Sequence, residues 1–146
     1  MIHLHAKNKL NMDLEGIINI SGKPGLYKVI SQGSNTVIVK SLNDGRKTPL
    51  HSNAQANMLE EIGIYTSDGT QSLSEIFDNI AQKENCKETI NHKSSEDELR
   101  AYFIEILPDY DQDRVYLSDI KKVFQWYNAM QKHDLIKITK KEVTKK

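Results

Sequence analysis

The chain has 146 residues with 20 basic and 20 acidic side chains, so its formal net charge is zero. That length fits one ordinary domain or two small ones, and a neutral chain has no overall electrostatic attraction to nucleic acids or membranes. No apolar run approaches the ~20 residues that span a bilayer. The single cysteine, Cys86, excludes an intrachain disulfide and a multi-cysteine zinc site. The composition predicts a cytoplasmic protein with no membrane contact and no cofactor.

Residues 1–11 are polar, contain two lysines and show no periodicity. A patterned segment begins at Met12, which indicates that residues 1–11 are disordered or a spurious extension and that Met12 is the true start. The alternative is a frayed native terminus. The two histidines in this segment, His3 and His5, would make only a weak metal site on a mobile tail.

Residues 12–80 show the pattern of a small β-rich module. The apolar residues between 14 and 20 suggest a short turn of helix, and a second helical turn, capped by Ser52 or Asn53, is expected within 52–61. Strands are predicted by β-branched and alternating runs at residues 26–31, 36–42, 47–51 and 62–66. Asp44-Gly45 is a hairpin signal, and Pro49 marks residues 47–51 as an edge strand.

A capping helix closes this module. Ser72 is a favourable N-cap, and the apolar spacing after it, at Leu73, Ile76, Phe77 and Ile80, predicts an amphipathic helix. Short strands joined by tight turns and covered by one helix indicate a small antiparallel module, SH3-like or a partly open barrel. The fold class expected for the chain is α+β.

The second half has a helical period. Residues 81–94 are polar and read as a linker, with Cys86 as a bystander. Residues 95–131 predict a helical hairpin: a capping box at Ser95 opens the first helix, Pro108 ends it, and Ser118 caps the second. Residues 132–146 are expected to form a short strand, Leu135–Thr139, and a lysine-rich tail.

Three alternating carboxylates, Asp109, Asp111 and Asp113, lie between the two helices and resemble a calcium loop. The required glycine position holds Arg114, and the position of the bidentate glutamate holds Ile120. The pattern therefore indicates a solvated acidic turn, with Arg114 paired to a neighbouring carboxylate, rather than a metal site.

The candidate binding residues are basic or aromatic. Those of the β module could gather on one side of its sheet and contact a nucleic acid: Lys23, Tyr27, Lys28, Arg46 and Lys47. Tyr27 and Lys28 point to opposite faces of one strand, however, and residues 12–80 have a net charge of −3, which argues against this surface. Trp126 lies off the apolar stripe of its helix and is either an interface anchor or packed on the first module.

The motifs ISGKPGLYK, at 20–28, and YLSDIKKVFQWYN, at 116–128, resemble a family of small uncharacterised Bacteroidetes-type bacterial proteins that carry a domain of unknown function. The resemblance supplies no activity and no functional residues. No catalytic constellation is visible, so the favoured hypothesis is a non-catalytic protein-interaction or adaptor module. The alternatives are a nucleic-acid-associated protein, aided by the lysine tail, and an enzyme acting on a small metabolite. Residues 96–119 contain eight acidic and two basic side chains. Pairing of this acidic surface with the basic tail of another copy would give a homo-oligomer.

Overall fold

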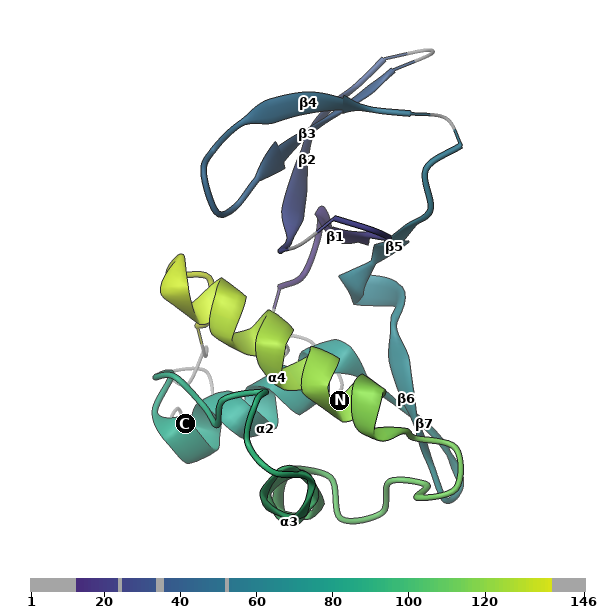
Figure 1. Ribbon diagram of the computed structural model, residues 1–146, viewed down its shortest axis with the longest axis vertical. Coiled ribbons are helices and arrows are strands. Elements are labelled where there is room, and N and C mark those ends of the chain that lie inside the picture. Colours follow the sequence, from purple (N-terminus) through teal and green to yellow (C-terminus); the bar gives the residue numbers. More distant parts are fainter. Residues whose placement is uncertain (1–12, 24, 34–35, 52, 138–146) are drawn as a thin grey trace, which may run out of the picture. The chain divides into compact units, whose positions relative to one another are not determined.

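In the computed structural model, residues 13–23, 25–33, 36–51 and 53–137 are described, and they divide into two compact units (Figure 1). The sheet unit is Leu14–Ile62, and the helical unit contains the described residues from Gly63 onward. The predicted boundary at residue 80 therefore requires correction, because the two strands and the helix that begin between residues 63 and 80 belong to the helical unit. The predictions for residues 1–11 and for the lysine tail lie outside the described residues.

The sheet unit contains five antiparallel strands: β1 (Ile17–Ile20), β2 (Tyr27–Gln32), β3 (Val37–Ser41), β4 (Lys47–Leu50) and β5 (Ala56–Met58). Their order across the sheet is β4-β3-β2-β1-β5, and a short 3-10 helix, η1 (Leu59–Glu61), follows β5. The buried side chains of Ile18, Ile20 and Val39 form a hydrophobic core cluster in this unit. The α+β class is confirmed, and the sheet is open at its two edge strands.

The β2, β3 and β4 predictions are confirmed. The turn between β3 and β4 has Gly45 at a φ of +74°, a conformation that glycine adopts without the steric cost of a Cβ atom. The backbone N–H of Arg46 donates to the carboxylate of Asp44 at 2.9 Å, as expected of aspartate in a turn. Pro49 lies in the edge strand β4. Proline has no backbone N–H to donate, and an edge strand tolerates this because it pairs with a neighbour on one side only.

Two helical predictions in the sheet unit were wrong. Ile17–Ile20 forms β1, which pairs with β2 on one side and with β5 on the other. A central strand is buried on both faces, so its apolar residues run consecutively and imitate a buried helical turn. The segment 53–61 forms β5 and η1 because Ala56–Met58 pairs with Ile18–Ile20. The Ser52 cap lies outside the described residues.

The helical unit contains a β-hairpin and three helices: β6 (Gly63–Thr66), β7 (Gly69–Ser72), α2 (Leu73–Glu84), α3 (Glu96–Ile106) and α4 (Leu117–Lys132). Ser72 is confirmed as an N-cap, accepting from the N–H of Glu75 at 3.3 Å, and Ser95 forms a full capping box. The prediction for Ser118 was wrong by two residues. Tyr116 is the N-cap of α4, and its N–H donates to the Asp119 carboxylate at 3.0 Å.

The predicted two-helix hairpin is therefore incomplete, because α2 packs with α3 and α4 in the same unit. Two helices alone would leave much of their apolar stripes in water. The third helix completes a core of edge-to-face aromatic rings, including Phe77 with Tyr127 and Phe103 with Phe124. No helix among the described residues has the length and apolarity needed to cross a membrane.

The segment between α2 and α3 is packed against the helices, which corrects the prediction of a polar linker at 81–94. Its first four residues are the last turn of α2. Thr89 is buried, its N–H donates to Oδ1 of Asn128 at 2.8 Å, and its hydroxyl donates to Tyr102 at 2.6 Å. The hydroxyl of Tyr127 donates to the carbonyl of Lys87 at 2.8 Å. Residues 135–137 are not a strand, although Ile136 is buried.

Tyr127 predicts a loss of stability at alkaline pH. Burial raises the pKa of its hydroxyl above the ordinary value of 10.0, whereas in the unfolded chain the hydroxyl ionises near that value. The stabilisation is therefore complete below about pH 10 and declines as the pH rises, because the unfolded state releases the proton first. We expect Tyr127→Phe to cost about 1 kcal/mol at neutral pH, from the lost hydrogen bond, and to flatten the alkaline decline.

Urea unfolding at several alkaline pH values measures both effects. Tyr116→Phe is the matched control, because it removes a hydroxyl from a side chain that is 64% exposed. An equally steep alkaline decline in the Tyr127→Phe protein would contradict the prediction.

Candidate functional site

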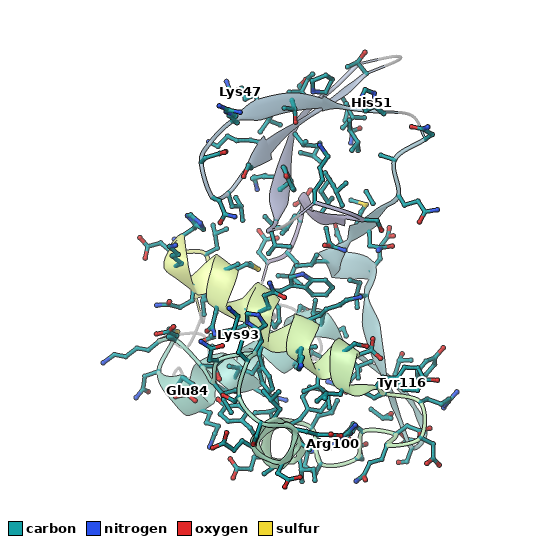
Figure 2. The ribbon with its side chains drawn as sticks, viewed as in Figure 1. Lys47, His51, Glu84, Lys93, Arg100 and Tyr116 are labelled. Carbon is teal, nitrogen blue, oxygen red and sulfur yellow. The ribbon has the colours of Figure 1, made fainter. Side chains whose placement is uncertain are left out.

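Three lysines stand in direct register on three adjacent strands of the sheet unit. Lys28 of β2 pairs with Lys40 of β3, and Lys40 pairs with Lys47 of β4. Residues directly opposite in neighbouring strands project from the same face of a sheet. All three side chains are exposed. We call this set, Lys28, Lys40 and Lys47, the lysine row; Figure 2 labels its edge member, Lys47.

The pair of residues next to Lys28 and Lys40 in the strands shows which face of the sheet carries the lysine row. Val29 pairs with Val39, which is 1% exposed and part of the core. Because successive residues alternate between faces, Lys28 and Lys40 lie on the face opposite this core. Tyr27 packs against the core cluster, so it does not share a surface with Lys28, as the alternation predicted.

The structure divides the six predicted binding residues between the two units. Lys23 is exposed in the turn after β1, and Arg46 is exposed beside Lys47. Lys40 was missed by the sequence analysis, because a two-residue turn at Asp44-Gly45 would place Lys47 opposite Leu42. The observed turn is centred one residue earlier, and this register pairs Lys40 with Lys47. Trp126 is half-buried on α4 in the helical unit.

A second candidate surface lies in the helical unit and consists of Tyr65, Arg114 and Tyr116, which we call the tyrosine–arginine patch. Tyr65 of β6 is 46% exposed, because strand alternation buries its neighbours Ile64 and Thr66. The guanidinium carbon of Arg114 lies 4.2 Å from the centre of the Tyr65 ring. Tyr116 is exposed two residues further on, in the segment that precedes α4 (Figure 2).

Hydrogen bonds hold the Tyr65–Arg114 pair in place. Nε of Arg114 donates to Oδ2 of Asp111 at 2.9 Å, and the N–H of Asp111 donates to the carbonyl of Tyr65 at 2.9 Å. The N–H of Ser67 donates to the carbonyl of Asp109 at 2.9 Å, which joins the hairpin turn to the same loop. The geometry presents an oriented guanidinium and two exposed phenol rings on one loop and hairpin.

The acidic turn does not resemble a vacant calcium loop. The Asp111 carboxylate accepts from Arg114 through Oδ2 and from the N–H of Asp113 through Oδ1, and Arg114 lowers the pKa of this carboxyl below its usual value. The predicted pairing of Arg114 with a neighbouring carboxylate is confirmed. Across the described ranges, no group of three His, Cys, Asp or Glu side chains is placed to hold a metal ion.

The sequence analysis did not identify the tyrosine–arginine patch. One local signal was available. In the strand Gly63-Ile64-Tyr65-Thr66, alternation places Ile64 and Thr66 on one face, which can pack on the core, and Tyr65 on the other face. The contact between Tyr65 and Arg114 joins residues far apart in the sequence, and no local pattern shows it.

Comparisons with known proteins agree with the two structural units. Residues 14–59 match the family model Domain of unknown function (DUF5606), and residues 62–130 match Domain of unknown function (DUF6852). A solution NMR structure from Bacteroides vulgatus, determined by a structural genomics consortium, is 40% identical in sequence. The similarity covers 88% of this chain and 92% of that one, with a TM-score of 0.71. No curated protein matches the chain.

The boundary between the two family models falls between residues 59 and 62, where the sheet unit gives way to the helical unit. The resemblance found in the sequence motifs and the near-complete alignment with the Bacteroides vulgatus protein lead to the same assignment. The chain belongs to an uncharacterised Bacteroidetes-type family in which DUF5606 is followed by DUF6852.

Proposed function

We propose that this protein is a non-catalytic protein-interaction module and that the tyrosine–arginine patch contacts its partner. One observation carries the proposal: the guanidinium of Arg114 is already oriented by Asp111 and by the exposed ring of Tyr65. A second exposed tyrosine, Tyr116, follows Arg114 by two residues in the same segment. Tyrosine and arginine are enriched among the few residues that dominate binding energy at protein interfaces. A side chain that is ordered before binding loses less conformational entropy when the partner arrives.

The charges around the patch indicate the chemistry of the partner. Asp68, Asp109, Asp111 and Asp113 lie in the two loops that carry or adjoin Tyr65 and Arg114. Over residues 63–137 the sequence has 14 acidic and nine basic side chains. Exposed phenol rings also attract the cations of lysine and arginine. The partner segment that fits this surface is basic.

A peptide titration followed by NMR tests the proposal. Isotope-labelled full-length protein is titrated with a lysine- and arginine-rich peptide, and with a second peptide in which the basic residues are replaced by glutamate. We expect the basic peptide to shift the amide resonances of Tyr65, Arg114 and Tyr116. Tyr116→Ala should weaken the interaction about tenfold, as for an interface residue worth about 1.4 kcal/mol.

Asp97→Asn in α3 is the control, because it removes an exposed carboxylate from another acidic segment. An equal loss with Asp97→Asn and Tyr116→Ala would show diffuse electrostatic attraction and overturn the proposal. The absence of shifts at the patch at low salt would do the same. Light scattering on the free protein distinguishes a second copy of this chain as the occupant.

The lysine row favours a second candidate function, association with nucleic acid. The lysine row lies in the sheet unit and the tyrosine–arginine patch lies in the helical unit, so substitutions in one surface test it without altering the other.

A further inference from the structure

We infer that the lysine row binds the phosphate backbone of a nucleic-acid duplex, an activity beyond the proposed protein-interaction role. The row places three ammonium groups on strands that are neighbours in the sheet. Adjacent strands are about 4.8 Å apart, so the backbone positions of Lys28 and Lys47 lie about 10 Å from each other. Arg46, next to Lys47 in the chain, is opposite Ser41, so strand alternation does not place it with the row.

This alignment is costly without an anionic ligand. Like charges directly opposite each other on one face destabilise a sheet. The remaining cross-strand neighbour of Lys28 is Ile17, so no carboxylate interrupts the register. The three salt bridges that join two described residues, Lys83–Glu105, Arg100–Glu96 and Arg114–Asp111, involve none of the three lysines. A ligand that brings closely spaced negative charges would remove the repulsion.

Protection of the sheet edge explains only part of the row. Lysine and proline on an edge strand prevent pairing with other chains, and β4 has both Lys47 and Pro49. Lys28 and Lys40 lie on β2 and β3, each of which has a hydrogen-bonded strand on both sides. These internal strands have no free edge to protect, so the cations on them require another explanation.

The boundary between the units removes the earlier objection from charge. The net charge of −3 over residues 12–80 included four acidic residues that lie outside the sheet unit: Asp13, Asp68, Glu75 and Asp78. Between Leu14 and Ile62 there are five basic and four acidic residues, a net charge of +1. The local charge of the unit that carries the row is therefore compatible with a polyanion.

The composition of the sheet unit favours a duplex over a single strand. Proteins that bind single strands stack bases on aromatic rings, but Tyr27 is the one aromatic residue in positions 14–62 and packs against the core. Lysines can still neutralise phosphates, and a duplex has the higher density of phosphates along its axis. Contact through phosphates alone carries no direct sequence readout.

Fluorescence anisotropy of a labelled DNA duplex with the full-length protein tests the inference over a series of salt concentrations. Three phosphate contacts predict that the logarithm of the binding constant falls with the logarithm of salt concentration at a slope of about −3. Lys40→Gln should reduce the magnitude of that slope by about one. Replacement of all three row lysines by glutamine should abolish saturable binding at moderate salt.

The control is a triple variant with the same loss of charge in the helical unit, Lys87→Gln, Lys122→Gln and Lys132→Gln, at three exposed positions. Circular dichroism verifies the fold of both triple variants. We expect the control to keep most of the affinity. Equal loss in both variants, absence of binding at low salt, or equally effective competition by polyglutamate would overturn the inference. Tyr116→Ala should leave duplex binding unchanged, which separates this result from the peptide test.

Discussion

Phe103→Ala is expected to lower the free energy of unfolding of the helical unit by about 3–5 kcal/mol. Phe103 is fully buried, and its ring meets Tyr110 and Phe124 edge-on at centroid distances of 4.9 and 6.0 Å. Truncation removes the buried ring and leaves a cavity among neighbours that belong to α4 and to the segment after α3. Urea unfolding followed by circular dichroism measures the loss.

Ile104→Ala is the matched control, because Ile104 follows Phe103 on the same helix and is 42% exposed. Its truncation should cost less than about 1 kcal/mol of unfolding free energy, because a partly exposed side chain buries less apolar surface on folding than a fully buried one. If the two variants lost similar stability, the ring cluster would not be the centre of the core.

Asn128→Ala is expected to cost about 2–4 kcal/mol and to release the segment between α2 and α3. Oδ1 of Asn128 accepts from the N–H of Thr89 at 2.8 Å. Its amide nitrogen donates to the carbonyls of Ile90, at 3.2 Å, and Thr89, at 3.4 Å. Alanine would leave these backbone groups without their partner next to a buried Thr89.

Hydrogen exchange locates this second effect. The amide of Thr89 should exchange much faster in the Asn128→Ala protein than in the unmodified one, whereas amides in the middle of α3 should change only with global stability. Gln125→Ala, at an exposed position of the same helix, should leave both stability and exchange unchanged. Unaltered protection of Thr89 would mean that Asn128 does not hold the segment.

The two candidate surfaces separate the charge of a neutral chain. The lysine row lies in the sheet unit, with a net charge of +1, and the tyrosine–arginine patch lies in the helical part, with 14 acidic and nine basic residues over 63–137. The zero net charge of the whole chain is therefore a weak argument against nucleic-acid binding. Salt screens charges more than about 10 Å apart, so the charge near a binding surface matters more than the total.

Elements with short-range physical causes were predictable from the sequence by itself. The hairpin of β3 and β4 depends on the turn at Asp44-Gly45, and the starts of α2 and α3 depend on Ser72 and Ser95. The buried stripes of the helices follow from apolar spacing, and Pro108 ends α3 because the residue before proline avoids helical geometry. Each of these signals acts within a few residues.

Only the tertiary structure decided which segments pair and which surfaces form. β1 is a strand because β2 and β5 pair with it on both sides, and the segment around Thr89 is ordered because Asn128 bonds to it from 39 residues away. The lysine row depends on the register of three strands, and the tyrosine–arginine patch on the approach of Arg114 to Tyr65. The sequence determined local conformation, but long-range pairing decided the unit boundary and both surfaces, because those contacts depend on partners that no local pattern identifies.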